Sequence, residues 1–196
     1  ITLLCLQRKQ VEIRCIAPDE DQMHVVDHQI GQPVENQSRN ILSESARIAR
    51  GDVVKLSDID VKDYNAIVFP GGFGAAKNLC DFAVKGADMS VKPLVNDLII
   101  NAHKSKIPLG FICIAPVIAA KVLGEHKPSL TIGVDEATAN AVEQLGAKHI
   151  STNVDEIAVD SDNKLVSTAA YMLGPTIADV YTGIEKLVDK VIELID

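Results

Sequence analysis

The 196-residue chain is predicted to fold as a doubly wound α/β domain, in which helices cover both faces of a mostly parallel sheet. Short apolar runs rich in β-branched residues alternate along the chain with amphipathic stretches of helical periodicity. Aromatic residues make up only 4% and Trp is absent, so Val, Ile, Leu and Ala must fill the core, as is typical of parallel sheets. The length indicates one domain over residues 1–196.

Strands are expected where an apolar run stops at Pro, Gly or another turn-forming residue. Three such runs cover residues 11–17, 66–69 and 109–114. Near the C-terminus, residues 156–160 and 164–168 flank Ser161-Asp162-Asn163, which predicts a β-hairpin.

Helices are expected where apolar residues recur at three-to-four spacing. The stretches are 38–50, 91–104, 136–145 and 175–195, and Gly51 and Gly146 stop the first and the third. The last stretch is predicted to lay one apolar face on the sheet, formed by Ile177, Val180, Ile184, Leu187, Val191 and Leu194.

The first residues predict the end of a buried helix that leads into the 11–17 strand. A hairpin is disfavoured there, because Gln7-Arg8-Lys9-Gln10 lacks the Gly or Asn that a tight turn needs. A flavodoxin-like strand order then requires an interior strand before Ile1, since a sheet without it leaves ladder groups unpaired. We therefore expect the natural protein to be longer at its N-terminus and this domain to be incomplete there.

Charge and cysteine content narrow the classes of function. The net charge of −8 argues against nucleic acid and anionic membrane surfaces as partners, since both select clustered Lys and Arg. No apolar run approaches the roughly 20 residues that span a bilayer. Four cysteines without CxxC spacing argue against a disulfide framework or a zinc site and favour a reducing compartment.

The five histidines are scattered along the chain, and none adjoins Cys113. His24 and His28 are four residues apart, which on a helix would place both rings on one face. No third ligand accompanies them. We therefore predict neither a metal nor a cofactor.

The strongest chemical signal is the sequence GFICIAP at residues 110–116. An apolar strand runs into Cys113, Ala115 is small enough for a sharp turn, and Pro116 suits the first turn of a helix. This pattern predicts a nucleophile elbow, in which the positive end of the helix favours the thiolate. The alternative is a buried Cys that packs as a small apolar residue.

A second signal is FPGGFGAAKNL at residues 69–79. Consecutive glycines after a strand let backbone N–H groups approach a ligand oxygen, and this loop is expected to open on the same sheet edge as Cys113. It could then supply an oxyanion hole. The alternative is an ordinary βα turn, and the missing Lys-Ser/Thr ending excludes a phosphate loop.

These two motifs, with QMHVVDH at 22–28 and SRNILSESARIARG at 38–51, make the chain similar to one amidotransferase-like branch of the PfpI-like (DJ-1) superfamily. The branch includes the bacterial enhancing-lycopene-biosynthesis protein and its animal mitochondrial counterpart, the ES1 protein. The resemblance covers nearly the whole chain and looks more like the animal branch. It implies a class I glutamine-amidotransferase-like domain, mitochondrial in the animal branch and cytoplasmic in a bacterium.

The resemblance also implies a site. Cys113 would be the nucleophile, and backbone groups of Gly71, Gly72, Phe73 and Ile114 would hold substrate or oxyanion. The rim would include Asn78, Thr168 and Tyr171. Relatives usually have Pro at position 169, where this chain has Ala169. The family's catalytic carboxylate is expected before Ile1.

The implied activity is a glyoxalase-like conversion of small dicarbonyls to hydroxy acids by a lyase or hydrolase with a Cys nucleophile. Two alternatives stay open: a thiol redox sensor, and an interaction protein with a dead site. Glutamine amidotransfer needs a Cys–His–Glu triad, and no His-x-Glu pair follows Cys113. The expected partners are a small carbonyl substrate and, by analogy with relatives, a second copy of the chain in a homodimer.

Overall fold

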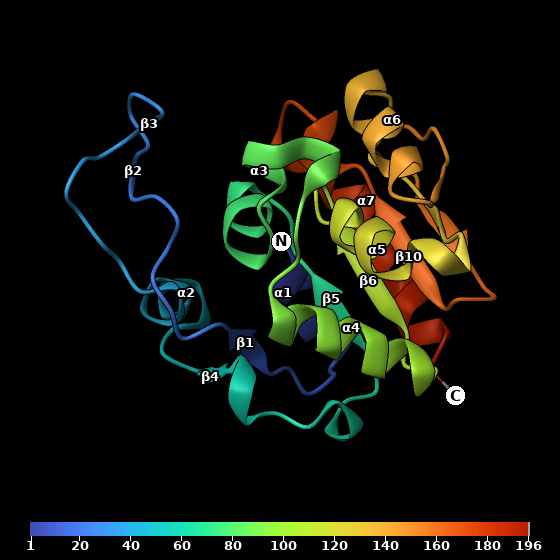
Figure 1. Ribbon diagram of the computed structural model, residues 1–196. Helices are drawn as coiled ribbons and strands as arrows, with labels where there is room; N and C mark the ends of the chain where they lie inside the picture. The colour runs from blue at the N-terminus through green and yellow to red at the C-terminus, as the bar shows by residue number, and fades with distance from the viewer. Residues whose placement is uncertain (196) are drawn as a thin grey trace.

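A four-stranded sheet in the order β5–β6–β10–β9 forms the centre of the computed structural model, which describes residues 1–195 (Figure 1). The strands are β5 (Ile67–Phe69), β6 (Leu109–Ile112), β10 (Leu165–Thr168) and β9 (Ala158–Asp160). β5, β6 and β10 run parallel, and β9 pairs antiparallel with β10. The predicted α/β class and the predicted C-terminal hairpin are therefore confirmed.

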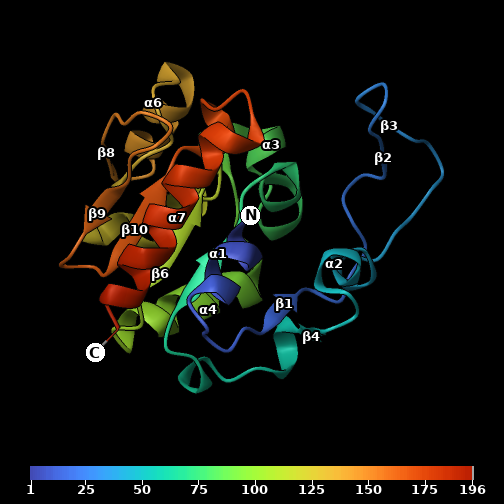
Figure 2. The ribbon, with the colours of Figure 1, turned by 180° about the vertical axis from the view of Figure 1, so that it is seen from behind.

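Helices cover both faces of this sheet. α4 (Pro93–Lys104) and α5 (Pro116–Leu123) lie on the face seen in Figure 1. α7 (Ile177–Glu193) and α1 (Thr2–Arg8) lie on the face seen in Figure 2. Successive side chains of a strand point to opposite faces of the sheet. Phe111 therefore belongs to the core beneath α4 and α5, and Ile112 to the core beneath α7.

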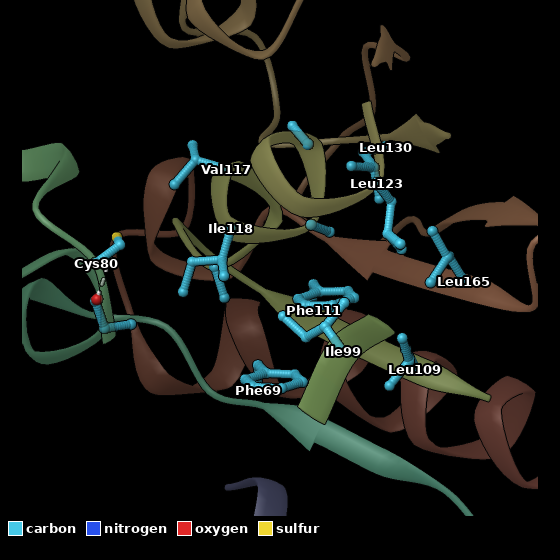
Figure 3. Close-up of a cluster of buried hydrophobic side chains, with 14 of the residues drawn as sticks. Phe69, Cys80, Ile99, Leu109, Phe111, Val117, Ile118, Leu123, Leu130 and Leu165 are labelled. Atoms are coloured by element: carbon cyan, nitrogen blue, oxygen red, sulfur yellow. Dashed lines mark hydrogen bonds between the residues drawn. The ribbon is translucent and has the colours of Figure 1, made fainter. Parts of the chain in front are cut away.

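The core on the α4–α5 side centres on two aromatic rings. Phe69 of β5 and Phe111 of β6 stack with their centroids 4.9 Å apart (Figure 3). Ile99 of α4 and Ile118 of α5 are fully buried beside them. Side chains of this size each contribute roughly 1.5–3 kcal/mol when removed from water, so this layer fixes β5 against β6.

The opposite face depends on close packing of α7 against β6. A Cβ on Gly110 would lie 3.0 Å from Leu187 and 3.1 Å from Val191, so a side chain at this position would push the helix away. α7 begins with a capping box between Thr176 and Asp179. The predicted apolar face is confirmed from Val180 to Leu194, but Ile177 is 69% exposed because it precedes the part of α7 that rests on the sheet.

The predicted helix at the start of the chain is confirmed as α1, whose Cys5 is buried. The strand that follows is shorter than expected. β1 covers only Cys15–Ala17 and pairs parallel with the equally short β4 (Val53–Lys55). Within residues 1–195 no ladder joins this pair to β5. The flavodoxin-like order predicts an interior strand at this place, and that strand stays a prediction.

Between β1 and β4 the chain forms an arm that extends away from the body in both views (Figures 1 and 2). It carries a small antiparallel hairpin of β2 (Val26–Asp27) and β3 (Gln32–Pro33). His24 and His28 lie on this arm and not on a helix. Their spacing of four residues therefore does not place both rings on one helix face. The arm leads into α2 (Ile41–Ala49), which is capped by the Asn40 side chain.

The remaining elements are short. α6 (Glu136–Gln144) packs on α5 beside a parallel pair of β7 (Ser129–Leu130) and β8 (Lys148–His149). Single turns of helix complete the fold: α3 (Phe82–Lys85), η1 (Leu56–Asp58), η2 (Val61–Asp63), η3 (Ala75–Leu79), η4 (Gly86–Asp88), η5 (Gly124–His126) and η6 (Ala170–Met172). Within residues 1–195, no helix has both the length and the apolarity needed to cross a bilayer.

Candidate active site

Cys113 directly follows β6 and has the backbone geometry of a nucleophile elbow. Its φ is 62°, in the left-handed region that costs a non-Gly residue roughly 1–2 kcal/mol. The Cys113 N–H donates to the Thr168 carbonyl at 2.9 Å, which ties the turn to β10. The chain then enters α5, which has Pro116 at its start. The predicted strand–turn–helix arrangement is confirmed, and it places Cys113 at the carboxyl edge of the parallel strands.

The double-glycine loop lies directly against this elbow. A Cβ on Gly71 would lie 2.4 Å from the Ile112 carbonyl oxygen, 2.5 Å from the Cys113 Cβ and 3.1 Å from the Ile114 nitrogen. Such a close approach of two main chains is possible only because Gly71 has no side chain. The predicted meeting of the two loops is confirmed. It follows from the parallel pairing of β5 with β6, since both strands end at the same edge.

Backbone N–H donors lie in both loops. Within the described residues, the N–H groups of Gly72, Phe73 and Ile114 donate to no acceptor of the chain. Gly72 has φ 88°, a conformation that turns the loop and favours Gly. The first turn of α5 adds the positive end of a helix. The arrangement can stabilise negative charge on sulfur or on an oxygen bound beside it.

The four thiols lie in different environments. Cys113 and Cys15 are half-buried, whereas Cys5 and Cys80 are buried, and of the four only Cys113 lies at the elbow. Burial raises the pKa of Cys5 and of Cys15, and it raises the pKa of Cys80 to about 11. The Cys80 thiol also donates to the Ala75 carbonyl at 3.5 Å (Figure 3). Cys113 is therefore the best candidate for a reactive thiol.

No imidazole or carboxylate in residues 1–195 is hydrogen-bonded to Cys113. The Cys–His pair that amidotransfer chemistry requires is thus not formed by these residues. Two of the histidines contact each other elsewhere, His103 and His126, and a third, His149, packs beside β7.

The three predicted rim residues occupy different places. Tyr171 follows the end of β10 and is 54% exposed, and Phe73 in the glycine loop is 75% exposed. Thr168 is fully buried, and its hydroxyl donates to the Glu156 carbonyl at 2.9 Å. Its side chain therefore does not line the rim of the site, and its carbonyl supports the elbow by accepting from the Cys113 N–H. Asn78 accepts a hydrogen bond from the arm, at Met23, and lines a separate cavity of about 440 Å³.

A buried polar network beside the elbow was not predicted. Thr131 donates its N–H to the Ser167 hydroxyl at 2.9 Å, and its own hydroxyl contacts that of Thr152 at 2.8 Å and accepts from Gly133. These bonds fasten the segment after β7 to β10. The only signal in the sequence is a pair of hydroxyl residues inside an apolar run at 165–168, which identifies no partner.

Comparison with known proteins gives close relatives. A rat protein named "ES1 protein homolog, mitochondrial" is 44% identical over 201 residues, which cover 98% of this chain and 75% of the rat protein. A human protein named "Glutamine amidotransferase-like class 1 domain-containing protein 3, mitochondrial" is also 44% identical, over 98% of this chain and 74% of that protein. No protein-family model matches the chain.

Solved structures agree with these relatives. An isoprenoid biosynthesis protein with an amidotransferase-like domain from Ehrlichia chaffeensis superimposes with a TM-score of 0.89 at 31% identity, covering 98% of this chain and 88% of that one. A DJ-1 superfamily protein from Salmonella typhimurium gives a TM-score of 0.51 at 18% identity and shows the shared fold alone. Both curated mammalian relatives are named mitochondrial, as expected for the animal branch.

Proposed function

Because the chain belongs to the ES1 family of amidotransferase-like proteins, we propose that it is a cysteine-dependent enzyme that converts small dicarbonyls into hydroxy acids. The observation that supports this most is the contact between Gly71 and the Cys113 elbow. This contact supports the proposal because it brings the glycine loop next to the Cys113 Cβ, so that N–H groups of the loop could bind the oxygen of an attacked carbonyl.

The proposed reaction begins with attack of the Cys113 thiolate on an aldehyde carbon of glyoxal. A C–S bond forms and the carbonyl π electrons move to oxygen, which accepts hydrogen bonds from Gly72, Phe73 or Ile114. A base then moves the proton of the attacked carbon to the neighbouring carbon through an enediol. The attacked carbon is oxidised to a thioester while its neighbour is reduced to an alcohol. Water cleaves the thioester, releasing glycolate and the thiol.

The base is the part of this mechanism that residues 1–195 do not provide by hydrogen bonding to Cys113. A carboxylate in a segment before Ile1 stays a prediction from the family resemblance. Location in mitochondria and formation of a homodimer are likewise proposed for this chain from its relatives.

The test is glycolate formation from glyoxal, measured for the natural full-length protein. Cys113→Ala is expected to abolish turnover, because it removes the sulfur that forms the C–S bond at the elbow. Cys80→Ala is the matched control, since its thiol is buried in the core, and a folded Cys80→Ala protein should retain turnover. Unchanged turnover in Cys113→Ala, or no turnover in the unmutated protein, would contradict the proposal.

A thiol redox sensor is the second candidate. The position of the half-buried Cys113 at the start of a helix favours it, because oxidation follows exposure and thiolate character; Cys15 is also half-buried, but it lies in a strand. Both candidates need a reactive Cys113, but only the first predicts turnover of glyoxal.

A further inference from the structure

We infer that His103 and His126 form a binding site for a divalent transition-metal ion that accepts imidazole ligands, such as Ni²⁺ or Cu²⁺. His103 lies in the last turn of α4, and His126 ends η5. The two residues lie on different elements of the chain, yet their ring centroids are 4.5 Å apart and the ring planes are inclined at 45°. The pair is at the edge of the sheet opposite Cys113, because α4 ends where β6 begins.

The separation of the rings allows one ion to contact both. A metal bound about 2.1 Å from an imidazole nitrogen lies about 3.2 Å from the ring centroid. Two rings that share one ion are then about 4.5 Å apart for a right angle at the metal and about 5.2 Å apart for a tetrahedral angle. The observed 4.5 Å, which is also an ordinary distance for rings in contact, brings both rings within reach of one ion. Imidazole ligands suit Ni²⁺, Cu²⁺ and Zn²⁺.

A hydrogen-bond network fixes the orientation and tautomer of the His103 ring in a form that can bind a metal. Its Nε2 lies 3.0 Å from Asn163 Oδ1, and the Asn163 amide group donates to Asp160 at 2.9 Å. Because Asp160 accepts from the amide nitrogen, the Asn163 oxygen must face His103, and Nε2 must carry the proton. The Nδ1 lone pair is then free for a metal. A ligating imidazole usually donates its other N–H to an oxygen in this way.

The surrounding charge favours a cation. Burial would raise the pKa of Asp160, but hydrogen bonds from Asn163 and from the Ser129 N–H outweigh it, so the pKa is lowered and the carboxylate stays ionised. His103 also lies at the negative end of α4. His126 is exposed and His103 is half-buried, so an ion can enter from solvent.

Within residues 1–195, no three His, Cys, Asp or Glu side chains are arranged to hold a metal. The remaining positions around the ion would therefore be filled by water. Structural metal sites are closed by four protein ligands. A site with two protein ligands therefore exchanges its ion readily and does not stabilise the fold as a structural metal would.

The experiment uses the full chain and Ni²⁺ as the probe. Binding is followed by calorimetric titration, and the site is located by the paramagnetic broadening of backbone amide signals in NMR. One saturable site is expected, with broadening around residues 103, 126 and 163. His126→Ala is exposed and should fold normally, and it is expected to abolish this site. Asn163→Ala should weaken it about tenfold, as loss of an outer hydrogen bond to a ligand typically does.

The double variant His24→Ala, His28→Ala is the matched control, because it removes two histidines from the arm and should leave the site intact. The inference is overturned by the absence of saturable binding, by unchanged affinity in His126→Ala, or by broadening confined to the arm or to the surroundings of Cys113.

Discussion

Replacement of Gly71 by Ala tests the contact on which the candidate active site depends. The new Cβ would lie 2.4 Å from the Ile112 carbonyl oxygen, whereas ordinary contacts begin at 3.4 Å. Its other near neighbours are the Cys113 Cβ and the Ile114 nitrogen, so the clash is with main chain and a first side-chain atom that cannot rotate away. The glycine loop must therefore move away from the elbow by about 1 Å.

Two effects of different size follow. Overpacking at a close contact typically costs about 1–3 kcal/mol of stability, which at this chain length lowers Tm by about 2–4 °C for each kcal/mol. A displacement of about 1 Å in a catalytic group can reduce turnover about a hundredfold. The expected outcome is a folded protein with a modestly lower Tm and a much larger loss of glyoxal turnover.

The assay measures Tm by calorimetry and kcat/KM for glyoxal in the same preparations. Gly74→Ala is the control in the same loop, because its Cβ would meet nothing within 4 Å and its φ of −58° suits any residue. It should change stability by less than about 0.5 kcal/mol and leave turnover intact. Equal kcat/KM in Gly71→Ala, Gly74→Ala and the unmutated protein would refute the role assigned to the loop.

Two further predictions concern thiol and histidine chemistry. Under mild peroxide, peptide mass spectrometry should find Cys113 oxidised before Cys5, Cys15 and Cys80, and equal oxidation of all four would contradict its assignment as the reactive thiol. Burial lowers the pKa of His149, and the opposing effects of Glu143 and a backbone hydrogen bond are smaller. The unfolded chain therefore binds a proton at this residue below about pH 6.5, whereas the folded chain binds it only at a lower pH. The free energy of unfolding from urea titration should therefore fall between pH 7 and pH 5, and His149→Gln should flatten that slope; an unchanged slope would show that another group causes it.

Local patterns in the sequence were enough to predict the sheet and the elbow. The run at 109–114 is apolar at every position except Gly110 and leads to Pro116, and such a pattern has few other solutions in an α/β chain. The contact of Gly71 with Cys113 could also be anticipated, because parallel neighbouring strands end at one edge.

Features set by distant parts of the chain could not be predicted. The run at 11–17 forms only three residues of strand because its partner β4 is equally short, and no local pattern reports a partner's length. Thr168 was assigned to a rim, but its burial depends on α7, where a Cβ on Gly183 would lie 2.7 Å from the Thr168 hydroxyl. The His103–His126 pair was missed because each histidine, taken alone in the sequence, is typical of a surface position.

The left-handed backbone at Cys113 has an evolutionary consequence. With φ at 62°, glycine is the residue that the fold itself prefers there, by about 1 kcal/mol over any residue with a Cβ. Selection for stability alone would thus favour glycine at this position, and the chemistry of a thiol there has to offset that cost.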